Sequence, residues 1–367
     1  MTKKLKSVAR TTHKRKFLGA IVCLALCMNA CKPPQKETDT IFGNGVLVLC
    51  EGLMSQNNSA LSYYNFDTET LTYDVFNEKN QRSLGDNASD MQIYGSKLYI
   101  VVNNSNRLEI IDLHTGVSLK GITFFDADNR PQQPNHIAFY GSNAYVSCYD
   151  GTICRIDTAS LTVDKSVQAG QNPEGLCATA GKLYVCNSGG FNYPNYDSTV
   201  SVFDLATLSE IKKINLTINP RFAAADKLGN VYIFSQGNYN DVMPTLQRID
   251  TQADVVVNSA LINNASKFCI AASKAYIFGY DYFSGQTVCK SFSLPSLTEI
   301  GDCITDGTEI KVPYALFINE LTEDLYIADA IDYTSDGKVY VFGADGKQKK
   351  MFSTAINPNT ILLSKQF

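Results

Sequence analysis

A pattern of three apolar segments recurs along this 367-residue chain, and it restricts the possible folds more than any other feature. Each copy has an apolar segment, a short turn, a second apolar segment, a loop, and a third segment that often ends in "ID" or "FD". A tyrosine marks the second segment of six copies: Tyr99, Tyr145, Tyr184, Tyr232, Tyr276 and Tyr326. Their spacing is typical of β-propellers, in which every blade is a four-stranded sheet.

The two ends of the repeat region complete one further blade. The start, "GVLVLCEG" with the segments after it, supplies second, third and fourth strands but no first strand. The end, "NPNTILLSK", resembles an isolated first strand. Joining them closes a ring and removes open sheet edges, which otherwise promote aggregation. The sequence therefore predicts an all-β fold, a seven-bladed β-propeller over residues 41–367, with ring closure by the C-terminal strand.

The first 30 residues have the pattern of a lipoprotein signal peptide. Seven basic residues precede the apolar run Phe17–Ala30, which is shorter than the about 20 residues that a membrane-spanning helix needs. The small residue Ala30 lies directly before Cys31, and residues 31–40 are polar and rich in proline. We expect a lipid on Cys31 and a flexible tether over residues 31–40. A soluble secreted protein that is cleaved nearby is the alternative.

Charge and cysteine placement exclude several classes of protein. The net charge is −4 and basic residues cluster only at the N-terminus, so nucleic acid is not an expected partner. Most of the eight cysteines after Cys31 lie inside apolar segments, where cysteine acts as a small hydrophobic residue. Only Cys148 and Cys154, which flank a short hairpin, are placed to form a disulfide. No CxxC pair is present, so we expect no metal site.

Residues that recur once per blade are expected to be structural. Aspartates end five of the third strands, at Asp67, Asp112, Asp157, Asp204 and Asp250, where they can accept hydrogen bonds from turn N–H groups. Asn172-Pro173, Asn219-Pro220 and Asn357-Pro358 precede the inner strands. His136 has no serine, cysteine or carboxylate placed beside it in the sequence, and no catalytic motif occurs. We predict no enzymatic activity, no catalytic residue and no cofactor.

The loops between second and third strands contain many aromatic residues. "GGFNYPNYDS", residues 189–198, has three aromatic rings among Gly, Asn, Pro and Asp. In a propeller, all loops of this kind emerge on one face together with the connections between blades. Bracing of the loops is one explanation, and a binding face for a small molecule or a protein is the other. The predicted ligand-binding residues are Tyr149, Phe191, Tyr193, Tyr196, Tyr239, Tyr280, Tyr282, Phe283 and Tyr333.

Several segments resemble known families. "PEGLCATAGKLYV", Pro173 to Val185, resembles the repeat of YncE-like extracytoplasmic propellers. "VLVLCEG", "NNSALSYYNFDTETL" and "LGDNASDMQIYGSKLYIVVNNSNRLEIID" are similar to surface lipoproteins of gut Gram-negative anaerobes, including the BtuG-type proteins that capture vitamin B12. This resemblance implies lipid anchoring in the outer membrane, exposure at the cell surface, and capture of cobalamin or another corrinoid for a TonB-dependent transporter.

Three functions follow from these patterns. The first is a non-enzymatic surface lipoprotein that captures a nutrient ligand. The second is a propeller for protein contact, in adhesion or in a surface complex. The third is an enzyme of the lactonase or lyase kind, which the lack of an acid/base constellation in the sequence disfavours.

Overall fold

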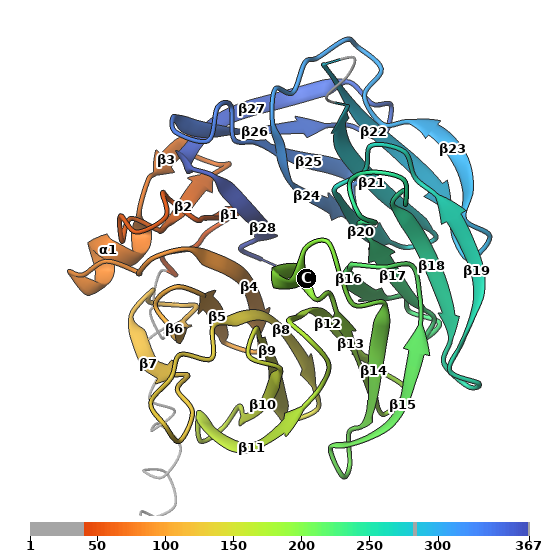
Figure 1. Cartoon of the computed structure of the whole chain (residues 1–367). Helices are drawn as coiled ribbons and strands as arrows, with labels where there is room; N and C mark the ends of the chain where they lie inside the picture. Colours follow the sequence, from red (N-terminus) through yellow and green to blue (C-terminus); the bar gives the residue numbers. More distant parts are fainter. Residues whose placement is uncertain (1–39, 282–284, 366–367) are drawn as a thin grey trace, which may run out of the picture. The chain divides into compact units, whose positions relative to one another are not determined.

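Strands form almost all of the regular structure in residues 40–281 and 285–365, which are the residues that the computed structural model describes. They make seven four-stranded antiparallel sheets, which Figure 1 shows as the blades of a ring. The predicted seven-bladed β-propeller is therefore confirmed. The predicted signal peptide and the lipid on Cys31 lie outside the described residues. Within those residues, no helix has both the length and the hydropathy that crossing a bilayer requires.

The blades follow one another along the chain, each beginning with its inner strand. Blade 1 contains β4 (Ala88–Tyr94), β5 (Lys97–Val102), β6 (Arg107–Asp112) and β7 (Ser118–Thr123). Blade 2 contains β8 (Pro134–Tyr140), β9 (Asn143–Cys148), β10 (Thr152–Asp157) and β11 (Thr162–Gln168). Blade 3 contains β12 (Pro173–Thr179), β13 (Lys182–Asn187), β14 (Thr199–Asp204) and β15 (Ser209–Asn215), with the 3-10 turn η1 (Gly190–Asn192) in its middle loop.

The next three blades repeat this order. Blade 4 contains β16 (Pro220–Ala225), β17 (Val231–Ser235), β18 (Thr245–Asp250) and β19 (Val255–Leu261). Blade 5 contains β20 (Lys267–Ala271), β21 (Lys274–Asp281), β22 (Gln286–Ser293) and β23 (Thr298–Asp302). Blade 6 contains β24 (Pro313–Asn319), β25 (Asp324–Asp329), β26 (Asp336–Phe342) and β27 (Gln348–Ile356).

Blade 7 joins the two ends of the propeller. Its strand order is β28 (Pro358–Leu363), β1 (Gly45–Cys50), β2 (Ala60–Asn65) and β3 (Thr70–Thr72). The C-terminal strand β28 pairs antiparallel with β1, from Val46 opposite Leu363 to Cys50 opposite Pro358. The predicted ring closure is confirmed, because the inner strand of this blade comes from the opposite end of the chain to its other three strands.

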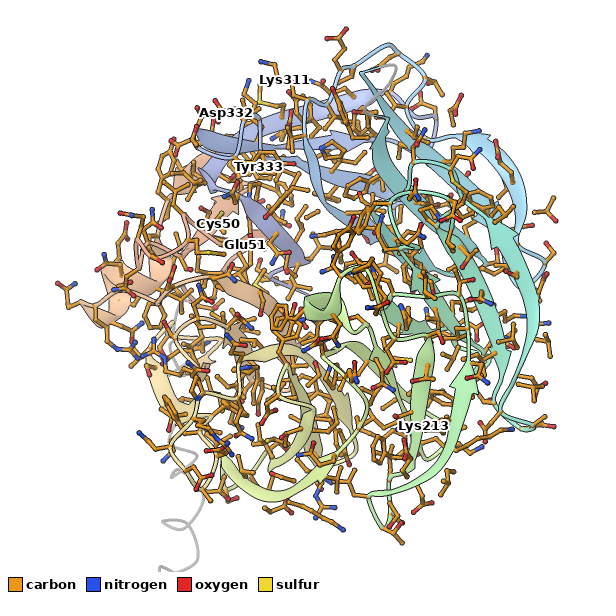
Figure 2. The ribbon with its side chains drawn as sticks, viewed as in Figure 1. Cys50, Glu51, Lys213, Lys311, Asp332 and Tyr333 are labelled. Carbon is orange, nitrogen blue, oxygen red and sulfur yellow. The ribbon has the colours of Figure 1, made fainter. Side chains whose placement is uncertain are left out.

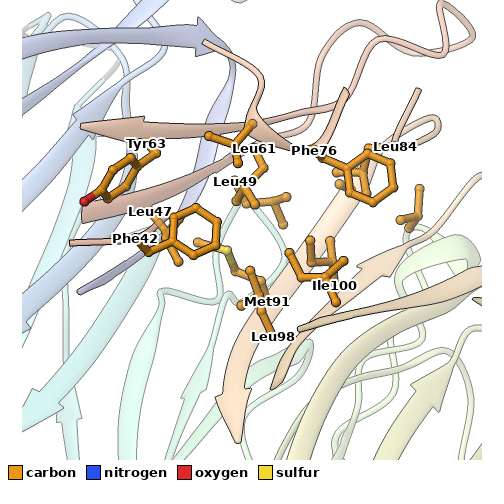
Figure 3. Close-up of a cluster of buried hydrophobic side chains, with 14 residues drawn as sticks. Phe42, Leu47, Leu49, Leu61, Tyr63, Phe76, Leu84, Met91, Leu98 and Ile100 are labelled. Atoms are coloured by element: carbon orange, nitrogen blue, oxygen red, sulfur yellow. The ribbon is translucent and has the colours of Figure 1, made fainter. Parts of the chain in front are cut away.

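The hydrophobic core lies between neighbouring blades. Figure 3 shows the cluster between blades 7 and 1, where Leu47 and Leu49 of β1 pack against Met91, Leu98 and Ile100 of blade 1. All five side chains are fully buried. Because strand side chains alternate between the two faces of a sheet, each blade contributes apolar side chains to both of its neighbours. Burial of apolar surface between blades therefore holds the ring together.

The tyrosines that mark the repeat are core residues. Tyr99, Tyr145, Tyr184 and Tyr232 are fully buried. The Tyr184 hydroxyl donates a 2.6 Å hydrogen bond to Asp254 Oδ1 in the β18–β19 turn of the next blade. This tyrosine therefore contributes apolar burial and also satisfies its polar tip with a bond between blades.

Turn hydrogen bonds confirm the structural role of most repeated aspartates. Asp112, for example, accepts from the N–H groups of His114 and Thr115 at 3.0 and 2.8 Å. The same arrangement occurs at Asp157, Asp204 and Asp250. Asp67 differs, because Asn65 accepts the turn N–H groups there and Asp67 accepts from Asn44.

One helix that the repeat pattern did not predict connects blades 7 and 1. Helix α1 (Val75–Asn80) begins after Asp74, whose carboxylate accepts a 3.1 Å hydrogen bond from the Asn77 N–H group. Its buried residues Val75 and Phe76 join the core between these two blades. The helix thus covers the blade whose outer strand, β3, is shortest.

Candidate functional site

The loops between second and third strands lie on the same face as the connections between blades, as predicted. Asn172, Asn219 and Asn357 directly precede the inner strands of blades 3, 4 and 7 and have positive φ angles of 43°, 59° and 56°. Their Nδ2 atoms donate to Tyr149 O, Gly237 O and Gly52 O at 2.9, 3.2 and 2.9 Å. These acceptors belong to loops between second and third strands, so the asparagines tie both kinds of connection together.

Five of the predicted aromatic residues come together on blades 2, 3 and 4. The ring of Tyr149 lies 4.8 Å from that of Phe191, measured between centroids. Tyr196 lies 6.0 Å from Tyr193 and 6.4 Å from Tyr239. We call these five residues the aromatic arc. Figure 1 shows that the loop with η1, drawn in green, extends over the middle of the ring.

The arc contains both exposed and half-buried rings. The side chains of Phe191, Tyr193 and Tyr239 are 66%, 71% and 63% exposed, although most large apolar side chains of this chain are buried. Tyr149 and Tyr196 are half-buried, and burial raises the pKa of both hydroxyls. The two half-buried rings therefore brace the loops, whereas the three exposed rings are available for contact.

The structure describes two of the other four predicted residues, Tyr280 and Tyr333, and both lie apart from the arc. Tyr333 lies near Tyr314 of blade 6, with 6.0 Å between the ring centroids. Tyr280 was predicted in a loop, which is wrong, because strand β21 extends to Asp281 and Tyr280 pairs with Thr287. It lines a separate hollow of about 610 Å³ beside Thr287 and Ile310. Tyr282 and Phe283 lie outside the described residues.

A second group of residues lies at the starts of the inner strands, and none of them is among the predicted ligand-binding residues. Figure 1 shows that β4, β8, β12, β16, β20, β24 and β28 are the innermost strands of the ring. The pairing of six of them with their second strands is irregular at the first residues. Such β-bulges redirect side chains and are frequent beside functional sites. The residues at the irregularities are Ser89, Asn135, Glu174 with Gly175, Arg221, Tyr314 and Asn359.

Charged and titratable side chains gather at this inner end of the blades. We call them the axial cluster, and its members are Glu51, Asp90, His136, Glu174, Arg221, Lys267 and Tyr314. Figure 2 places Glu51 on the inner side of blade 7, whereas Lys213 of β15 lies at the circumference of the ring.

An ion pair between blades 3 and 4 forms one side of the axial cluster. Arg221 Nε lies 2.8 Å from Glu174 Oε2, and the side chains are 34% and 3% exposed. The pKa of Arg221 is raised, first by Glu174 and further by the nearby hydroxyls of Tyr149 and Tyr239. The aromatic arc and the axial cluster therefore meet at Arg221.

A second group of contacts forms around Lys267. Its Nζ donates a 3.1 Å hydrogen bond to Asn359 Oδ1 and lies 5.0 Å from the centroid of the Tyr314 ring. The Tyr314 hydroxyl donates a 2.5 Å hydrogen bond to Glu51 Oε2. Burial lowers the pKa of Lys267 to about 8, although Glu51 acts in the opposite direction. Burial also raises the pKa of Glu51.

Asp90 and His136 complete the axial cluster. Burial raises the pKa of Asp90 to about 7, and its carboxylate accepts a 3.0 Å hydrogen bond from the Ile137 N–H group. Burial, with smaller effects from Arg221 and Lys267, lowers the pKa of His136 to about 3. Its Nδ1 atom is buried and has no hydrogen-bond partner among the described residues. Groups with strongly shifted pKa values concentrate at functional sites, which favours this cluster as part of one.

Sequence comparison assigns the propeller to a family. The model of a domain of unknown function, DUF5074, matches residues 44–358. The chain belongs to the DUF5074 family. This match spans nearly the whole propeller, from β1 to the start of β28. No curated protein matches the chain significantly.

Solved structures similar to this DUF5074 protein share its fold. A quinoprotein alcohol dehydrogenase-like protein from Bacteroides thetaiotaomicron is 17% identical, with a TM-score of 0.65 over 88% of this chain and 78% of that one. A chain of hydrazine synthase from Kuenenia stuttgartiensis is 15% identical, with a TM-score of 0.57 over 68% of this chain and 74% of that one. At such identities the similarity concerns the fold alone.

Proposed function

We propose that this protein is a non-enzymatic binding lipoprotein that captures a small nutrient ligand at the surface of the outer membrane. The aromatic arc, next to the axial cluster, is the observation that carries the proposal. Three exposed aromatic side chains on one face create a contact surface that loop bracing does not require. The adjoining polar groups provide the few directional contacts that orient a ligand.

The sequence resemblance to BtuG-type lipoproteins makes a corrinoid the first ligand to test. A corrin ring is broad and flat, so it can lie against several tyrosine and phenylalanine rings. Such aromatic contacts contribute about 0.5–1.5 kcal/mol each beyond the burial of area. A TonB-dependent transporter would be the partner that accepts the ligand.

Calorimetry with cyanocobalamin tests the binding face. We expect the double variant Tyr193→Ala/Tyr239→Ala to bind at least tenfold more weakly than wild type, because two exposed rings would be lost from the contact. The melting temperature should stay nearly unchanged, since both side chains lie largely outside the core. The matched control is Tyr73→Ala/Tyr140→Ala, which removes two exposed tyrosines from outside the arc. Equal affinity in both double variants would place the binding site elsewhere.

Detergent phase partitioning tests the proposed anchor. Wild-type protein from membranes should enter the detergent phase, and Cys31→Ala should remain in the aqueous phase because it lacks the acceptor for the lipid. Equal partitioning of the two proteins would refute the assignment of Cys31.

Protein contact is the second candidate function, and the exposure of Phe191, Tyr193 and Tyr239 is the observation that favours it. Aromatic residues are enriched at the centres of protein interfaces. Capture of a defined surface protein by wild type but not by the Tyr193→Ala/Tyr239→Ala variant, without any cobalamin binding, would support this function instead.

A further inference from the structure

The ion pair at Arg221 leaves part of its guanidinium group available. Glu174 is almost fully buried and contacts Nε, while the Arg221 side chain is one-third exposed. Among residues 40–281 and 285–365, neither terminal nitrogen of this guanidinium has a hydrogen-bond acceptor. A carboxylate that accepts from Nε fixes the orientation of the guanidinium group. The two terminal nitrogens can then bind an oxyanion in a planar, bidentate manner.

Lys267 is the second cation with unused hydrogen-bonding capacity. An ammonium group has three N–H donors, and the structure shows one acceptor for them, Asn359 Oδ1. No carboxylate of the described residues lies within 4.0 Å of its Nζ. Tyr314 contacts it only through the face of its ring.

These two cations come from consecutive blades and repel each other. Arg221 is the second residue of β16 and Lys267 is the first residue of β20. Burial lowers the pKa of Lys267, and the charge of Arg221 lowers it further, whereas Glu51 and Asp90 raise it. All three carboxylates of the axial cluster are already engaged, because Glu51 accepts from Tyr314, Glu174 accepts from Arg221 and Asp90 accepts from the Ile137 N–H group. A bound anion would relieve the repulsion and supply the missing acceptors for both cations.

We propose that Arg221 and Lys267 bind an oxyanion, a carboxylate or a phosphate, that the ligand carries next to the flat part held by the aromatic arc. This inference rests on the proposed capture of a small molecule at this face. It adds a requirement for negative charge, which neither the arc nor the fold imposes.

Calorimetry with two matched pairs of compounds tests this requirement. Adenosine 5′-monophosphate carries a phosphate that adenosine lacks. Benzoate carries a carboxylate where benzamide has a neutral carboxamide. We expect the anion of at least one pair to bind at millimolar concentration or below, and its neutral partner to bind at least tenfold more weakly. Whichever pair shows the difference identifies the oxyanion. If no anion binds better than its neutral partner, or if none of the four compounds binds, the proposal is overturned.

Variants of Arg221 and Lys267 test whether these two cations cause the preference for the anion. Lys267→Met and the double variant Glu174→Gln/Arg221→Gln should each reduce the preference for the anion to less than threefold. The double variant removes both charges together, so that no buried carboxylate is left unpaired. Arg248→Gln, which alters an arginine that bonds to Asn230 in blade 4, is the control and should keep the preference. Unchanged preference in both test variants, with melting curves like that of wild type, would overturn the proposal.

The outcome also separates this inference from the proposed function. If Tyr193→Ala/Tyr239→Ala abolishes binding of cyanocobalamin and the anions show no preference, the capture face stands and the oxyanion site fails. If the anion preference depends on Arg221 and Lys267 but the arc variant binds like wild type, the oxyanion site stands and the role of the arc fails.

Discussion

The second strands and the inner strands of the blades differ in how strictly one residue type recurs at the same repeat position. In the second strands, blade after blade places a buried tyrosine at the same position, for example Tyr145, Tyr184 and Tyr232. At the start of the inner strands the residues change from blade to blade: Asn135 is followed by Glu174 and then by Arg221. Identical residues at one repeat position serve a need that every blade shares, which is packing between blades.

Residues that differ from blade to blade at one repeat position have another role than packing between blades. Charged groups at the inner ends of the strands cost free energy to desolvate, and packing does not require them. The comparison therefore assigns stability to the second strands, and we propose that the axial cluster takes part in ligand recognition. Each of the following predictions tests one side of this division.

The largest effect is expected from deletion of residues 359–367, which removes most of β28. About five ladder hydrogen bonds at about 1 kcal/mol each and apolar side chains at about 2 kcal/mol each would be lost. This sum is comparable with the whole stability of a typical domain, about 5–15 kcal/mol. Circular dichroism should show no cooperative melting. A truncated protein that melts within a few degrees of wild type would show that closure at the Val46–Leu363 pairing is dispensable.

A smaller loss is expected when a repeated tyrosine is removed. Tyr184→Ala should lower the free energy of unfolding by about 3–5 kcal/mol, because it creates a cavity and leaves Asp254 without one donor. Urea denaturation measures the change. Lys267→Met is the matched axial variant and should unfold at the same urea concentration as wild type or a higher one, because it removes a buried charge. A loss of similar size in both variants would contradict the division between the two regions.

The smallest effect is a shift with pH. Asp90 has a pKa of about 7 in the fold, above its usual value, so it contributes stability that is fully present below about pH 4 and is lost as the pH rises through 7. Asp90→Asn stays neutral throughout. Its melting temperature should therefore rise relative to wild type by a few degrees between pH 4 and pH 7.5. A difference that stays constant across this range would mean that Asp90 ionises as it does in water.

The fold was predictable because its determinants repeat. The six tyrosines and the strand-like start and end of the propeller define blades and closure, and the turn aspartates were assigned to the turns where most of them lie. Tyr280 was misplaced because the ladder of β21 and β22 continues past the glycine at position 279, so the hairpin loop is shorter than the sequence suggests.

The axial cluster was not predictable in the same way. Its residues share no side-chain type, and a bulge of one residue decides which of them faces inward. One signal was present: proline begins the inner strand in five blades, and a polar residue follows it in every case, as at Glu174 and Arg221. The partners of these residues, such as Glu51 for Tyr314, come from distant parts of the chain. They can be identified only once the closed ring is known.

The reactivity of the free cysteines can report which interfaces between blades open transiently. Cys50, Cys148, Cys177 and Cys289 are buried free thiols in blades 7, 2, 3 and 5. Burial raises the pKa of Cys50 and Cys177 to about 12, so at neutral pH they hold almost no thiolate, the form that alkylating reagents attack. Alkylation at each cysteine therefore requires its own blade to separate from a neighbour. Mass spectrometry after timed labelling with iodoacetamide would give the labelling rate of each cysteine. These rates would rank the blades by how often each one opens locally.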